Sequence, residues 1–127
     1  MVFAQHDLNP YEVSARRAPE GADAFARAVI LTICSAAVTE SVGRRTFERC
    51  MRALESGGTA RMGFRHPSKA AAIDQIWRER HGYHRAFQAS ANRRAQLEQL
   101  PGIGPATARA LAARLGLHDA ADGRRAA

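Results

Sequence analysis

Five consecutive residues near the C-terminal end of the chain, PGIGP at 101–105, restrict the fold more than any other segment. The residue before a proline is pushed out of the helical region, so a helix that reaches this segment should stop at Leu100. Gly102 and Gly104 can take backbone angles that other residues avoid, and they carry no side chain to hold a partner away. Pro105 suits the first position of a new helix, because its missing N–H group costs nothing there. The segment predicts two helices joined by a tight hairpin.

The flanking sequence supports this hairpin. Ser90 can cap the first helix, which runs through Arg93, Arg94 and Leu97. The second helix has an apolar face, and Gly116 is placed to terminate it.

Upstream of the hairpin, apolar residues recur at helical spacing. Asp23 is a candidate cap for the most apolar helix, which we expect to be central. Thr39 is expected to cap a helix over Glu40–Glu55, and Gly57-Gly58 ends it. Its apolar stripe comprises Val42, Phe47, Cys50, Met51 and Leu54. Residues 57–65 are expected to form a loop.

A further helix should restart near Pro67 and be broken by Gly82. Trp77 lies on its apolar stripe, so a place in the core is favoured over stacking on a nucleic-acid base. No strand-like alternation is sustained along the chain. The sequence predicts an all-α fold, a compact bundle of about five to six short helices.

The domain organisation expected from these patterns is simple. Residues 1–22 form an irregular N-terminal arm, and residues 23–117 form one helical domain with the hairpin at 92–116. Residues 118–127 form a flexible basic tail. A chain of 127 residues is long enough for one modest core.

The charge is unevenly distributed. The chain carries a formal net charge of +7, and 18 of its 19 basic residues are arginines. From Arg78 to the end, nine arginines face four acidic residues, whereas the first 77 residues have an excess of only two positive charges. Concentration of the excess around the hairpin favours a polyanion partner there.

The hairpin itself offers an anion site. Its amides at Ile103, Gly104 and the start of the second helix are expected to be unpaired and to lie at the positive end of a helix dipole. DNA is the expected partner, bound through its phosphates without strong sequence preference. The arginines expected to assist are Arg93, Arg94, Arg109 and Arg114. Replacing Gly102 or Gly104 should weaken binding and leave the fold intact. A plain helical corner is the alternative interpretation.

Other classes of site find less support. Cys34 and Cys50 are expected to be buried free thiols, and they are too few to hold a structural zinc or an iron–sulfur cluster. His81 and His84 are expected to be surface residues near the basic region. No apolar run reaches the roughly 20 residues of a membrane span, and the N-terminus lacks the pattern of a signal peptide. A cytoplasmic location without membrane association is expected.

The segment LPGIGPATA, residues 100–108, followed by Leu111-Ala112, resembles the helix-hairpin-helix signature of DNA repair proteins. The upstream segments AFARAVILTICSAAVTESVGRRTFERCMRAL and HPSKAAAIDQIW are similar in order and spacing to the helix-hairpin-helix glycosylase superfamily, and to a bacterial branch of it. The resemblance covers roughly Asp23 to Leu117, and it suggests a C-terminally shortened member.

This resemblance implies that Gly102, Ile103, Gly104, Ala106 and Thr107 contact a DNA backbone phosphate. It also implies that carbonyl groups of the hairpin, those of Leu100 and Ile103, hold a monovalent cation, with no other cofactor.

Two departures from the family bear on catalysis. Bifunctional glycosylases carry a nucleophilic lysine where this chain has Ala106, so no lyase chemistry is expected. The aspartate that assists departure of the base corresponds best to Asp122, which lacks the family's Asp-x-His surroundings. DNA binding related to base-excision repair is therefore the main hypothesis. The alternatives are a minimal or remnant monofunctional glycosylase that uses Asp122, and a helical protein-interaction module, although no protein partner can be named.

Overall fold

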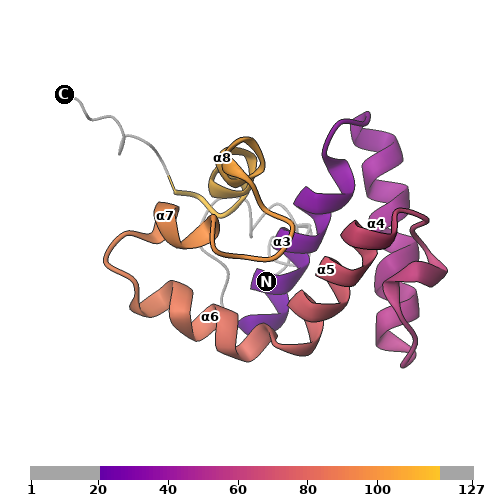
Figure 1. Cartoon of the computed structure of the whole chain (residues 1–127), viewed down its shortest axis with the longest axis horizontal. Helices are drawn as coiled ribbons and strands as arrows, with labels where there is room; N and C mark the ends of the chain where they lie inside the picture. Colours follow the sequence, from indigo (N-terminus) through magenta and orange to yellow (C-terminus); the bar gives the residue numbers. More distant parts are fainter. Residues whose placement is uncertain (1–20, 118–127) are drawn as a thin grey trace, which may run out of the picture.

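The structure, a computed structural model, describes residues 21–117. Within that range the chain forms six α-helices and one 3-10 turn, and it contains no strand. The prediction of an all-α bundle is confirmed, and Figure 1 shows the arrangement of the helices. The N-terminal arm up to residue 20 and the C-terminal tail, with Asp122, lie outside the described residues.

Helix α3 (Ala22–Ser35) is the central element, as predicted, because it contacts α4, α5, α6 and α8. Its buried residues are Phe25, Ala26, Val29, Ile30, Thr32, Ile33 and Cys34. The predicted cap is wrong. Gly21 occupies the capping position, and Asp23 lies within the first turn, where its carboxylate accepts a hydrogen bond from Arg80 at 2.7 Å.

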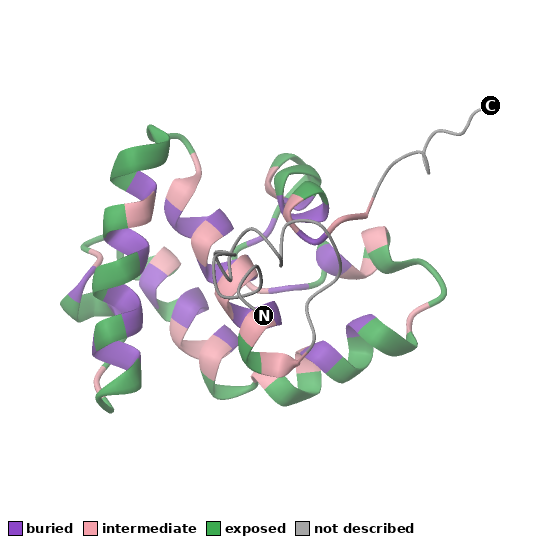
Figure 2. Cartoon of the chain, turned by 180° about the vertical axis from the view of Figure 1, so that it is seen from behind, coloured by how far each residue is buried: buried purple, intermediate pink, exposed green. Residues whose placement is uncertain are grey.

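Helix α4 (Glu40–Glu55) begins and ends where the sequence predicts. The hydroxyl of Thr39 accepts from the backbone N–H of Val42 at 3.3 Å, and Gly57 takes a positive φ of 91° beyond the last turn. Of the predicted stripe, only Val42 is exposed, at 39%. Figure 2 shows the inner face of each helix buried and the outer face exposed.

The predicted loop over residues 57–65 contains the 3-10 turn η1 (Ala60–Met62). This turn is anchored by helix α5, because the backbone N–H of Ala60 donates to the Asp74 carboxylate at 2.7 Å. Sequence periodicity did not predict it, since the anchor is fourteen residues away along the chain.

Helix α5 (Pro67–Arg78) starts at the predicted proline, with Nδ1 of His66 accepting from the backbone N–H of Lys69. The predicted break at Gly82 is wrong, because the chain bends at Glu79 and Gly82 lies inside α6 (Arg80–Ala89). A helical glycine costs only about 1 kcal/mol, which tertiary packing can offset.

The side chain of Trp77 is half-buried. It packs against the core, as predicted, and its ring also lies under the guanidinium groups of Arg80 and Arg27, at 4.0 and 5.3 Å.

Helices α7 (Arg93–Leu97) and α8 (Pro105–Arg114) flank the hairpin. The predicted cap Ser90 instead ends α6, and Asn92 caps α7 by accepting from the Ala95 N–H at 3.0 Å. Ser90 supports that cap, since its hydroxyl accepts from the Asn92 N–H. The start at Pro105 and the turn at Gly116, with a φ of 77°, are confirmed.

Candidate nucleic-acid interface

The hairpin between α7 and α8 is built on a tight turn from Leu100 to Ile103. The backbone N–H of Ile103 donates to the carbonyl oxygen of Leu100 at 3.2 Å, and Gly102 has a φ of 76°. A proline second and a glycine with positive φ third is the pattern of a type II turn. The expectation of an unpaired Ile103 amide is therefore wrong, because the turn itself takes that donor.

The inner side of this turn is fixed to the core. The side chains of Leu100 and Ile103 are each only 6% exposed. A Cβ added to Gly102 would approach the Cβ of Ala72 to 2.9 Å and the Cδ1 of Ile33 to 3.3 Å. Helices α5 and α3 therefore leave no room for a side chain at position 102.

The outer side of the hairpin is open at Gly104, which precedes α8. Gly104 has an extended backbone (φ −101°, ψ −173°), and a Cβ added there would meet nothing within 4 Å. No side chain of the described residues caps α8, whereas Thr39, His66 and Asn92 cap other helices.

Several backbone donors converge at this end of α8. Among residues 21–117, the N–H groups of Gly104, Ala106 and Thr107 find no protein acceptor, and the first hydrogen bond of the helix runs from Ala108 N–H to Gly104 C=O at 2.7 Å. Gly104 and Ala106 are exposed, and Thr107 is half-buried. Unpaired donors at the positive end of a ten-residue helix attract an anion.

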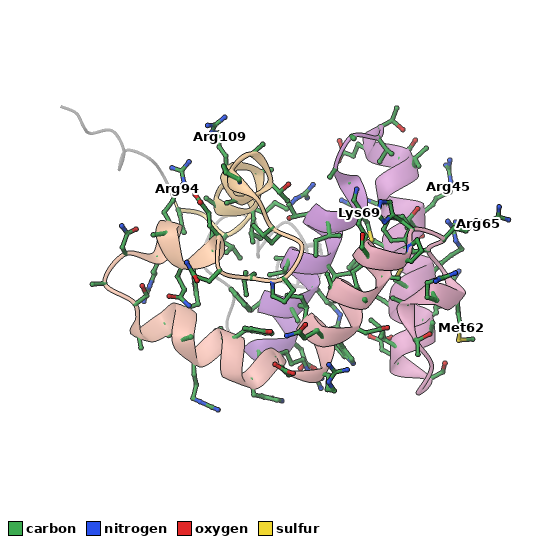
Figure 3. The ribbon with its side chains drawn as sticks, viewed as in Figure 1. Arg45, Met62, Arg65, Lys69, Arg94 and Arg109 are labelled. Carbon is green, nitrogen blue, oxygen red and sulfur yellow. The ribbon has the colours of Figure 1, made fainter. Side chains whose placement is uncertain are left out.

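Two of the predicted arginines accompany this helix end. Arg94 on α7 and Arg109 on α8 point to the same side of the molecule, the upper side in Figure 3. Arg109 is exposed and Arg94 is half-buried. Both side chains therefore add positive charge to that side of the molecule.

The other two predicted arginines are placed differently. Arg93 donates to the carbonyl of Gln88 at 3.2 Å, and its guanidinium lies 5.3 Å from the ring of Phe87, so it joins α7 to the end of α6. Arg114 lies in the last turn of α8, nine residues after Pro105, which is about 13 Å further along the helix axis. The structure therefore does not bring Arg114 to the hairpin.

Arg114 has an unusual environment of its own. Its Nε atom is buried and has no acceptor within the described part of the chain. Burial lowers the pKa of this guanidinium, and the nearby positive charge of Arg44 lowers it further.

The two carbonyl groups predicted to hold a cation differ in whether they already accept a hydrogen bond. The Leu100 oxygen accepts the turn hydrogen bond, whereas the Ile103 oxygen has no protein donor within residues 21–117. The same range contains no group of three or more His, Cys, Asp or Glu side chains arranged for a metal ion. The predicted catalytic residue Asp122 lies outside the described residues.

The thiols and histidines outside the hairpin were only partly predicted. Cys34 and Cys50 are buried free thiols, as expected. His81 is exposed, but His84 is buried, with its ring 5.4 Å from that of Phe25. The surface prediction for His84 is wrong, because its stacking partner is 59 positions away in the sequence.

Sequence reasoning missed the residue that orients α7, Asn92. Its position three residues before Ala95, directly ahead of a helix-forming run, is the signal that could have found it.

Residues 88–113 match the model of the helix-hairpin-helix motif. The match covers the end of α6, α7, the hairpin and all but the last residue of α8. Helix-hairpin-helix motifs are generally associated with DNA binding that is independent of sequence. No curated protein and no solved structure matched the chain significantly. Within the described residues, no helix is both long and apolar enough to span a membrane.

Proposed function

We propose that this protein binds the backbone of DNA without sequence preference, through the N-terminal end of α8. The observation that carries the proposal is the open set of donors at Gly104, Ala106 and Thr107 within a matched helix-hairpin-helix motif. A phosphate bound there accepts hydrogen bonds from several N–H groups at once and lies at the positive end of the helix.

Arg94 and Arg109 supply charge for the neighbouring phosphates on the same side. Contacts of this kind supply affinity and register but do not read bases. The binding constant for duplex DNA is therefore expected to fall steeply with salt and to vary little with sequence.

A monovalent cation on the carbonyl of Ile103 is part of this proposal. Within residues 21–117 that oxygen lacks a protein donor, and the Leu100 oxygen keeps a second lone pair beside its turn hydrogen bond. A bound cation supplies positive charge to the same phosphate.

Variants at Gly104 test the proposal, because this residue is the cap position of α8 and has open space for a side chain. In Gly104→Asp, the carboxylate can accept from the Ala106 and Thr107 amides, which are the second and third residues of the helix. This cap should stabilise the fold by a few tenths of a kcal/mol. Because the carboxylate occupies the donors meant for phosphate, the affinity for duplex DNA should fall about tenfold or more.

Two matched substitutions separate the causes. Gly104→Asn caps the same amides without negative charge and should lose less affinity, while Gly104→Ala leaves the amides open and should bind nearly as the parent does. Fluorescence anisotropy with labelled duplexes of unrelated sequence measures the affinity, and thermal unfolding measures the stability. Unchanged binding of DNA by Gly104→Asp would mean that the hairpin only turns the chain and does not hold a phosphate.

A relation to base-excision repair is a finer proposal, supported by the resemblance of residues 23–117 to the helix-hairpin-helix glycosylases. A minimal glycosylase that uses Asp122 would release alkylated, oxidised or deaminated bases and lose that activity in Asp122→Asn. If no lesion yields a product, the glycosylase hypothesis is rejected. Salt-independent binding to a protein, without retention of DNA, would favour an interaction module.

A further inference from the structure

A second group of basic side chains lies away from the hairpin. It consists of Arg45 on α4, Arg65 just before α5 and Lys69 in the first turn of α5, and we call it the α5 patch. Arg45 and Arg65 are exposed, and Lys69 is half-buried. None of the three side chains has an ion pair or hydrogen-bond acceptor within residues 21–117.

The acidic side chains around this patch leave its charge largely uncompensated. Residues 44–69 contain seven basic residues and two acidic ones, Glu48 and Glu55. Glu55 is paired with Arg27 of α3. Asp74, further along α5, accepts the Ala60 N–H. This local excess of positive charge is hidden when the charges of the first 77 residues are summed.

The patch and the hairpin face the same way. Figure 3 shows Lys69 and Arg45 pointing to the same side as Arg94 and Arg109, with Arg65 pointing outward beside Arg45. In this view, which is down the shortest axis of the molecule, the five side chains are spread along its length. Together they form a row of positive charge from α7 to α4.

We propose that the α5 patch contacts a second stretch of the backbone of the DNA duplex whose phosphate is held by the hairpin. The inference rests on the proposed function and adds the position of a second contact. A duplex presents two closely spaced rows of negative charge, so a protein with positive groups at both ends of one side can engage it at two places. Arginine and lysine side chains without protein partners are free to contact phosphate oxygens.

Two triple variants with the same loss of charge test this inference. The patch variant is Arg45→Gln, Arg65→Gln and Lys69→Gln. The matched control is Arg52→Gln, Arg78→Gln and Arg85→Gln, which are exposed residues in the last turns of α4 and α5 and on α6. Figure 1 shows α6 along the edge opposite α8. The dissociation constant of each full-length variant for one long duplex is measured across a series of salt concentrations, with Gly104→Asp measured in parallel.

Each lost phosphate contact reduces the slope of log K against log salt by about 0.9. The patch variant should therefore lose about two to three from the parent slope, while the control stays near it, and thermal unfolding should show that both are folded. Equal slopes for the patch and control variants would overturn the inference and leave the hairpin proposal standing if Gly104→Asp still loses affinity. Loss in the patch variant together with unchanged binding by Gly104→Asp would overturn the hairpin proposal and, with it, the two-place contact.

Discussion

Gly102 lies so close to Ala72 that a Cβ at position 102 would approach the Ala72 Cβ to 2.9 Å. This approach seats the hairpin on α5, and the positive φ of Gly102 makes the turn that directs the chain into α8. The two glycines of the motif therefore have different tasks. Gly102 serves the fold, while Gly104 leaves open space at the start of α8.

Gly102→Ala should destabilise the protein by about 1 to 3 kcal/mol, because a side chain is strained at this φ and collides with Ala72. The free energy of unfolding in urea measures this loss. Gly104→Ala is the control and should change it by less than about 1 kcal/mol. A double-mutant cycle with Ala72→Gly should show favourable coupling, since removing that methyl group relieves the collision. Equal effects of the two single glycine variants would contradict this account. The sequence-based expectation that both glycines can be replaced without harm to the fold therefore holds in this account for Gly104 alone.

The buried ring of His84 should make stability depend on pH. Burial lowers the pKa of His84 below its ordinary value of 6.5, and the nearby His81 lowers it further. The unfolded chain therefore binds a proton at a higher pH than the folded chain does, so stability should be greatest above pH 6.5 and should decrease as the pH falls below it.

His84→Phe keeps a ring beside Phe25 and removes the titrating group. The free energy of unfolding in urea is measured for the parent and this variant between pH 5 and 8. At the acidic end the variant should lose less stability than the parent. Parallel curves would show that His84 is not the source of the dependence.

The two cysteines should be unreactive in the folded protein. Cys34 and Cys50 are 3% and 0% exposed, and the contact with Cys50, together with burial, raises the pKa of the Cys34 thiol. Because the thiolate is the reactive form, labelling by a thiol reagent should occur only as fast as the protein opens. Ser41→Cys, at an exposed position in the first turn of α4, supplies a fast-reacting control. Rapid labelling of all three thiols would mean that the α3–α4 contact is open in solution.

Features that depend on neighbouring residues could be predicted from the sequence. The Thr39 cap, the start of α8 at Pro105 and the turn at Gly116 follow from the backbone preferences of single residues. The all-helical fold likewise follows from apolar spacing.

Features that depend on distant contacts could not be predicted. Gly82 stays helical, and His84 on the same helix is buried against Phe25 of α3. Ser90 and Asn92 are both good capping residues, and only the path of the chain decides between them.

The sequence predicted the hairpin, and the structure corrects which of its amides are open. A proline–glycine turn implies a hydrogen bond that consumes the Ile103 amide, so the open donors move one residue onward to Gly104 and the start of α8. Arg109, four residues after Pro105, is carried on the first turns of α8, whereas Arg114 lies too far along the helix to join it.

The central claim is that the first amides of α8 receive a phosphate, and a nuclear magnetic resonance titration tests it most directly. Amide protons that donate to a phosphate shift downfield, so the Gly104, Ala106 and Thr107 signals should move when a short duplex is added to the labelled protein. The Ala95 amide is the internal reference, because the Asn92 side chain already accepts from it. Downfield shifts at the three α8 amides with Ala95 nearly unchanged is the predicted result. Binding of the duplex with those three signals unmoved would contradict the account.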